Sequence, residues 1–94
     1  MKLLQTQAAQ DDLIAIWVSI AIENEATANR VLDEIGARLD LLPDFPEMGV
    51  ERNDIRAGLR MLVVRDYLVL YRLQPQHIEV VRVVHGRRDL GALA

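Results

Sequence analysis

The chain has 94 residues, of which 51% are hydrophobic and only 4% aromatic, so the composition predicts a globular domain with a core of Leu, Ile, Val and Ala. It contains no cysteine, which excludes disulfides and thiolate metal sites. No stretch reaches the roughly 20 apolar residues of a membrane span, and the N-terminus lacks a signal-peptide pattern. We therefore expect a single cytoplasmic domain over residues 1–94.

The charge is divided unevenly along the chain. Residues 1–47 carry nine acidic and three basic residues (net −6), while residues 48–94 carry eight arginines and five acidic residues (net +3). The overall charge is −3, and Lys2 is the only lysine. The second half therefore holds most of the residues that could contact an acidic or anionic partner.

The first half predicts a short strand over 2–5 and then two helices. Thr6 and Asn24 are suited to accept the unpaired N–H groups at the helix starts. Apolar residues follow at helical spacing, and Pro43 ends the second helix: Leu13, Ile16, Trp17, Ile20 and Ala21, then Ala28, Val31, Leu32, Ile35, Leu39 and Leu42. The short connection makes the helices an antiparallel hairpin, and Trp17 is expected to pack in the core with its N–H bonded nearby.

The second half predicts β-structure after a loop that contains Pro46 and Gly49. Apolar runs at 59–64, 67–73 and 78–85 are separated by short turns, which is typical of an antiparallel meander. The fold class is thus α+β, with the strand and helix hairpin packed on the meander. The runs are apolar on both faces of the sheet, so a second cover is expected. Either the C-terminal tail or the long loop provides it, or a partner binds there.

Few residues predict catalysis directly. His77 and His85 lie at opposite ends of one strand, so no metal site is expected, and no cofactor motif or activated nucleophile is present. What remains is a set of basic residues on or near strands that should be neighbours: Arg60, Arg82, His85, Arg87 and Arg88. This set suits phosphodiester cleavage, the binding of an acidic protein, or a solvated strand end.

In its whole length the chain resembles ParE-type members of the RelE/ParE toxin superfamily. The resemblance rests on motifs in a fixed order: Asp12-Leu13 with Ile16-Trp17, Ala28 to Ile35, Pro46 with Gly49, Gly58-Leu59-Arg60, Tyr67 to Tyr71, and Val84 to Asp89. It implies a type II toxin that a cognate antitoxin inhibits by wrapping across it. ParE-like members inhibit DNA gyrase, and RelE-like members cut messenger RNA on the ribosome.

The single lysine and the acidic balance favour gyrase as the target, because contact with ribosomal RNA favours a basic protein. No direct DNA binding by the toxin alone is expected. The alternative is a RelE-like ribonuclease, in which the resemblance assigns Arg60 to phosphate binding and His85 to general-base catalysis. A non-toxic relic or interaction module is the third hypothesis.

Overall fold

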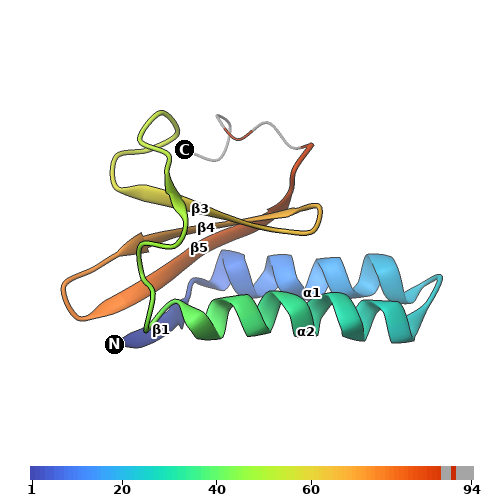
Figure 1. Cartoon of the computed structure of the whole chain (residues 1–94). Helices are drawn as coiled ribbons and strands as arrows, with labels where there is room; N and C mark the ends of the chain where they lie inside the picture. The colour runs from blue at the N-terminus through green and yellow to red at the C-terminus, as the bar shows by residue number, and fades with distance from the viewer. Residues whose placement is uncertain (88–89, 91–94) are drawn as a thin grey trace.

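The computed structural model describes residues 1–87 and residue 90. Over these residues the chain forms two helices and a five-stranded sheet in the order β1-β5-β4-β3-β2 (Figure 1). The elements are β1 (Lys2–Gln5), α1 (Gln7–Ala21), α2 (Glu25–Leu41), β2 (Val50–Glu51), β3 (Leu59–Val64), β4 (Tyr67–Leu73) and β5 (His77–His85). Within the described part, neither helix is long and apolar enough to cross a membrane.

Both helix starts are capped as predicted. The Thr6 hydroxyl accepts the Ala9 N–H at 3.0 Å, and the Asn24 side-chain oxygen accepts the Thr27 N–H at 2.9 Å. These bonds satisfy amide groups that have no partner inside the helix. α2 ends two residues before Pro43, which lacks the N–H needed to continue a helix.

The three long strands form the predicted meander, and β1 adds to it in parallel. Lys2 pairs with His77 and Gln5 with Val80, so β1 lies beside β5 and makes the sheet mixed. The two-residue strand β2 was not predicted. It pairs Val50 with Met61, and so short a strand in a loop that also contains proline and glycine has no detectable alternation.

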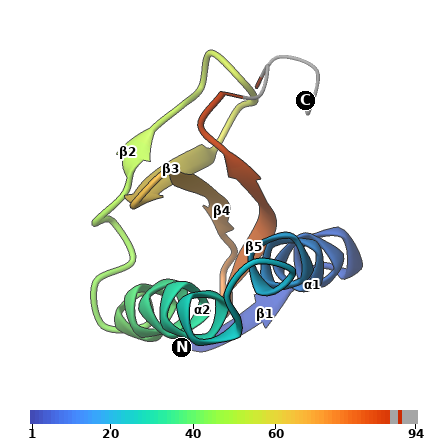
Figure 2. The ribbon, with the colours of Figure 1, turned by 90° about the vertical axis from the view of Figure 1, so that its right-hand side faces the viewer.

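The helices pack side by side on one face of the sheet, with α1 against β5 (Figure 2). Ile16, Ile35 and Leu39 are buried as predicted, and Leu13 packs half-buried against them. The Trp17 N–H donates to the Asn29 side chain at 2.8 Å, which joins the two helices. The sheet contributes the other half of this core through Leu62, Val64, Val69, Tyr71, Ile78, Val80 and Val83.

The opposite face of the sheet is less open than its apolar sequence suggests. Leu59, Leu70 and Val84 on that face are each at most 4% exposed, whereas Val63 is 52% exposed. The side chain of Arg52, from the segment before β3, contacts the Met61 sulfur at 3.2 Å. Much of the second face is therefore buried within the chain. Its apolar sequence does not by itself indicate a groove for a partner.

Two residues with positive φ lie before and after β3. Gly58 precedes β3 with φ +79°, and its N–H donates to the Asn53 side chain at 2.9 Å. Arg65 occupies the turn between β3 and β4 with φ +53°, a conformation that is uncommon for a residue with a Cβ. Its guanidinium forms an ion pair with Glu34 of α2, which ties the turn to the helix layer.

Candidate functional site

Arg60 lies at the start of β3 and holds the loop that follows α2. One terminal nitrogen donates to the Gly49 carbonyl at 2.6 Å and to the Glu47 carbonyl at 3.2 Å, while the other contacts the Glu51 carboxylate at 3.3 Å. The Arg60 side chain is only 16% exposed. Three acceptors of the protein itself thus engage this guanidinium, which is a structural arrangement rather than a free phosphate-binding group.

The side chain of Tyr71 also holds this loop in place. The buried hydroxyl donates to the Pro46 carbonyl at 2.8 Å and accepts the Gly49 N–H at 2.9 Å. Burial raises the pKa of the Tyr71 hydroxyl above its usual value, and the Gly49 N–H bond acts in the opposite direction. A Cβ on Gly49 would lie 2.7 Å from the Tyr71 ring, so this contact needs glycine.

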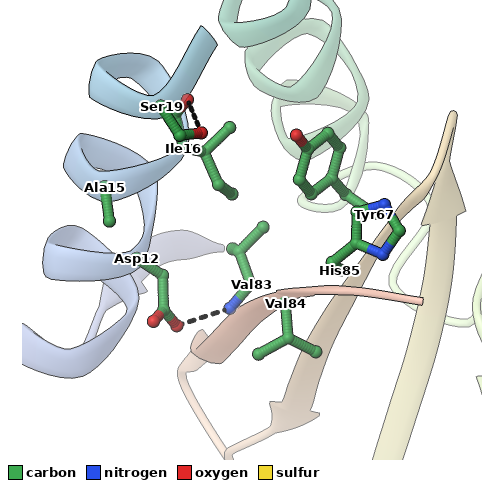
Figure 3. Close-up of a pocket in the computed structure, with 8 residues that line it drawn as sticks. All are labelled: Asp12, Ala15, Ile16, Ser19, Tyr67, Val83, Val84 and His85. Atoms are coloured by element: carbon green, nitrogen blue, oxygen red, sulfur yellow. Dashed lines mark hydrogen bonds between the residues drawn. The ribbon is translucent and has the colours of Figure 1, made fainter. Parts of the chain in front are cut away.

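Arg82 lies on β5 and is bound to α1. Its guanidinium donates to both carboxylate oxygens of Asp12, from Nε at 2.7 Å and from Nη2 at 2.9 Å. The hydrogen bond to Asp12 raises the pKa of Arg82. The same carboxylate accepts the backbone N–H of Val83 at 2.9 Å, and Figure 3 shows this bond. Asp12 therefore joins α1 to β5 through three hydrogen bonds.

This junction lies at a β-bulge. Leu70 pairs with Arg82 while Tyr71 pairs with Val80, so Val81 is an extra residue in β5. The Thr6 hydroxyl donates to the Val81 carbonyl at 2.7 Å. Thr6 thus bonds to the bulge residue itself, and Asp12 bonds to the two residues that follow it.

His85 is exposed at the end of β5, where its ring meets Tyr67 edge-on with centroids 5.6 Å apart and planes at 81°. Its Nδ1 accepts the backbone N–H of Arg87 at 3.2 Å. Arg87 is exposed, and Arg88 lies outside the described residues. An exposed imidazole on an aromatic edge is held in place without being buried, so it remains available to a partner.

Among the described residues of the predicted basic set, Arg60 does not lie in one cluster with His85. Arg60 shares a row of the sheet with Tyr71 and Val80, whereas His85 shares one with Tyr67. At ordinary strand spacings these rows are about 13 Å apart along the strands, and two strand spacings add about 10 Å across the sheet. The expectation that Arg60 and His85 lie on neighbouring strands is therefore wrong, because β4 separates β3 from β5 and the two residues also lie in different rows.

A groove that no local sequence pattern indicates separates α1 from the end of β5. It encloses about 270 Å³ and is lined by side chains from both elements and from β4 (Figure 3): Asp12, Ala15, Ile16, Ser19, Tyr67, Val83, Val84 and His85. The apolar helix pattern could have identified the α1 wall, but not its position relative to β5. Among the described residues, no group of three or more His, Cys, Asp or Glu is placed to hold a metal ion.

Residues 3–90 match the family model described as the ParE toxin of the type II toxin–antitoxin system parDE. The chain belongs to the ParE toxin family. Toxin ParE3 of Caulobacter vibrioides is 30% identical over 92 residues, which cover 97% of this chain and 92% of that protein.

Solved structures agree on the fold. The solved chromosomal ParDE toxin–antitoxin system from P. aeruginosa has a TM-score of 0.80 at 22% identity, over 90% of this chain and 95% of that one. A conserved hypothetical protein from Helicobacter pylori has a TM-score of 0.56 at 16% identity, over 90% and 93% of the two chains. At these identities, both structures show only that this chain shares their α+β fold.

Proposed function

We propose that this ParE family toxin inhibits DNA gyrase by binding it, and that a cognate antitoxin neutralises the toxin by covering part of its surface. Family membership supports the toxin role. The choice of a binding mechanism over a catalytic one rests on a separate observation about the arginines.

That observation is the engagement of Arg60 and Arg82 inside the protein. Arg60 donates to two loop carbonyls and contacts Glu51, and Arg82 donates twice to Asp12. A ribonuclease needs cationic groups directed at a phosphate and a nearby proton acceptor. Here the His85 ring is well separated from Arg60, and both arginines have acceptors of their own. The arrangement supports an inhibitor that breaks no bond itself.

The direct test uses purified toxin in two assays. One measures gyrase supercoiling together with trapped cleavage complexes, and the other measures cleavage of messenger RNA on programmed ribosomes. We expect inhibition in the first assay and no cutting in the second. A toxin that cuts messenger RNA and leaves supercoiling unchanged would overturn the gyrase proposal.

The variant His85→Ala separates the mechanisms further. In a ribonuclease, loss of a general base typically lowers the rate by about 10²- to 10⁴-fold. In a gyrase inhibitor the same change removes one exposed ring from a binding surface, and toxicity should fall far less. Growth after induction of each variant in bacteria provides the readout, and a chain that is harmless even as wild type would favour the non-toxic relic.

A further inference from the structure

The loop between α2 and β2 carries an exposed aromatic ring. Phe45 is the only phenylalanine of the chain, and it is 60% exposed. Together with Pro46, Glu47 and Met48 it lines a hollow of about 340 Å³. A phenylalanine usually contributes its large apolar area to a core. An exposed ring beside a hollow therefore indicates a contact surface for another molecule.

Phe45 has an exposed apolar neighbour at the end of α2. Leu41 is 42% exposed, and its carbonyl accepts the Phe45 N–H at 2.9 Å, so the two residues lie within one helical turn. Single exposed apolar residues are common on protein surfaces, whereas neighbouring ones are a better sign of a binding site. We call residues 41–49 the Phe45 loop.

The Phe45 loop is held in one conformation before any partner binds. The side chains of Arg60 and Tyr71 form four hydrogen bonds with its backbone. Inside the loop, the Met48 N–H donates to the Phe45 carbonyl at 3.1 Å. The backbone is thus fixed on both sides of the ring. A partner that accepts the ring has little loop entropy to overcome, which favours tight binding.

The surroundings of the ring are acidic. Residues 40–51 contain four acidic residues and no basic one, and all four are exposed: Asp40, Asp44, Glu47 and Glu51. Arg60 contacts Glu51 at 3.3 Å and offsets part of this charge. Such a surface repels the phosphates of a nucleic acid and a second copy of itself. It complements an apolar pocket that is bordered by lysine or arginine.

Of the two proteins in the proposed function, the target matches this surface. An enzyme that acts on DNA presents lysine and arginine to the phosphates, so gyrase offers positive charge for the acidic loop. A fixed ring also needs a pocket in a folded partner, and an extended segment that wraps across the toxin forms no pocket by itself. Figure 2 shows the segment from α2 to β2 on the side of the molecule opposite to α1.

We propose that Phe45 is the anchor by which this toxin binds gyrase. The ring enters an apolar pocket of the enzyme, and the acidic residues of the Phe45 loop pair with basic residues around that pocket. The inference rests on the gyrase part of the proposed function. The buried ring supplies most of the affinity, as central aromatic residues of interfaces commonly do, while the charges guide the approach and fix the orientation.

The first test compares Phe45→Ala with Ile14→Ala in the gyrase supercoiling assay. The two residues are 60% and 63% exposed, so neither change should unfold the toxin. We expect Phe45→Ala to raise the toxin concentration for half inhibition by about 30-fold, as for the loss of a central anchor. Ile14→Ala should stay within about twofold of wild type. Equal inhibition by the two folded variants would overturn the assignment.

The second test concerns the charges. The double variant Asp44→Lys with Glu47→Lys changes the net charge by +4, and so does the control Glu23→Lys with Asp33→Lys, which lies outside the loop. All four residues are exposed. We expect the loop variant to inhibit gyrase about tenfold more weakly at low salt, with a smaller difference at high salt, because salt screens exposed charges. Equal losses in both double variants would mean that only the overall charge matters, which contradicts the proposed pairing.

The outcomes separate this inference from the proposed function. If the wild-type toxin leaves supercoiling unchanged, the gyrase proposal fails and this inference falls with it. If the wild type inhibits and Phe45→Ala inhibits equally well, only the surface assignment is overturned. Antitoxin binding is measured on the same variants, and Phe45→Ala should bind the antitoxin like wild type. A Phe45→Ala toxin that still inhibits gyrase but no longer binds the antitoxin would assign the loop to the antitoxin instead.

Discussion

The carboxylate of Asp12 and the guanidinium of Arg82 form a two-point ion pair between the first helix and the last strand. Their side chains are 15% and 23% exposed, so water reaches neither group freely. Asp12 also accepts the Val83 N–H. A single carboxylate thus accepts three hydrogen bonds. Its removal leaves three donors without their acceptor at a partly buried site.

We expect Asp12→Ala to lower the free energy of unfolding by about 1.5 to 3 kcal/mol, the range for hydrogen bonds to charged groups. Asp12→Asn keeps one oxygen for the Val83 N–H and should lose less. Urea unfolding measures both. The matched control is Asp11→Ala, because Asp11 is an exposed neighbour that bonds only to Gln7 among the described residues. Equal losses for Asp11 and Asp12 would contradict the junction.

Two glycines provide opposite predictions for the same substitution. Gly49→Ala places a Cβ 2.7 Å from the Tyr71 ring and 2.9 Å from the Met61 carbonyl, so the loop or the ring must move. We expect a loss of about 1 to 3 kcal/mol, as for overpacking in a core. Gly36 lies within α2 with nothing within 4 Å of its added Cβ. Gly36→Ala should therefore gain about 0.5 to 1 kcal/mol through helix propensity. Thermal unfolding that moved both variants in one direction would refute this contrast.

The Tyr71 hydroxyl gives a prediction about pH. Tyr71→Phe leaves the Gly49 N–H and the Pro46 carbonyl without their partner, which should cost about 1 to 3 kcal/mol at neutral pH. Burial raises the pKa of Tyr71 in the folded state, so the neutral form is the one that folding favours. This contribution is complete below the unfolded pKa of about 10 and declines as pH rises above it.

Unfolding followed from pH 8 to pH 11 for wild type and Tyr71→Phe isolates that contribution, since all other groups are common to both proteins. The stability difference should narrow above about pH 10. A constant difference across the range would mean that the hydroxyl does not titrate differently in the two states.

The core prediction compares two isoleucines. Ile35 of α2 is 1% exposed, so Ile35→Ala should cost about 2 to 5 kcal/mol by leaving a cavity. Ile14 of α1 is 63% exposed, so Ile14→Ala should leave the stability within about 0.5 kcal/mol of wild type. Chemical denaturation of the two variants checks the helical phase, and a harmless Ile35→Ala would show that the phase is wrong.

The elements were predictable because local signals agree with the final packing. Thr6 and Asn24 start the helices, and the strand runs 59–64 and 67–73 match the observed bounds. The turn at Arg65 was also predicted, although it lacks glycine. In each case a few neighbouring residues carry the signal, so no tertiary information was needed.

The site was not predictable in the same way. Arg82 pairs with Asp12, 70 positions away, and the bulge at Val81 changes which way the following residues face. Neither fact has a local signal. In α1, Ile14 and Val18 are as apolar as Ile16, and only the tertiary packing shows which of them remain exposed.

The parallel pairing of β1 with β5 has a consequence for how the toxin is made. Lys2 pairs with His77 and Gln5 pairs with Val80. The first strand synthesised can therefore join the sheet only after the last strand has been synthesised. The helix hairpin needs only local contacts, but contacts between such distant residues form late and slow the folding of a chain. At about 5 to 20 residues per second, synthesis alone takes several seconds. A newly translated toxin therefore passes through an interval in which its helices can form but β5 and the groove between β5 and α1 do not yet exist.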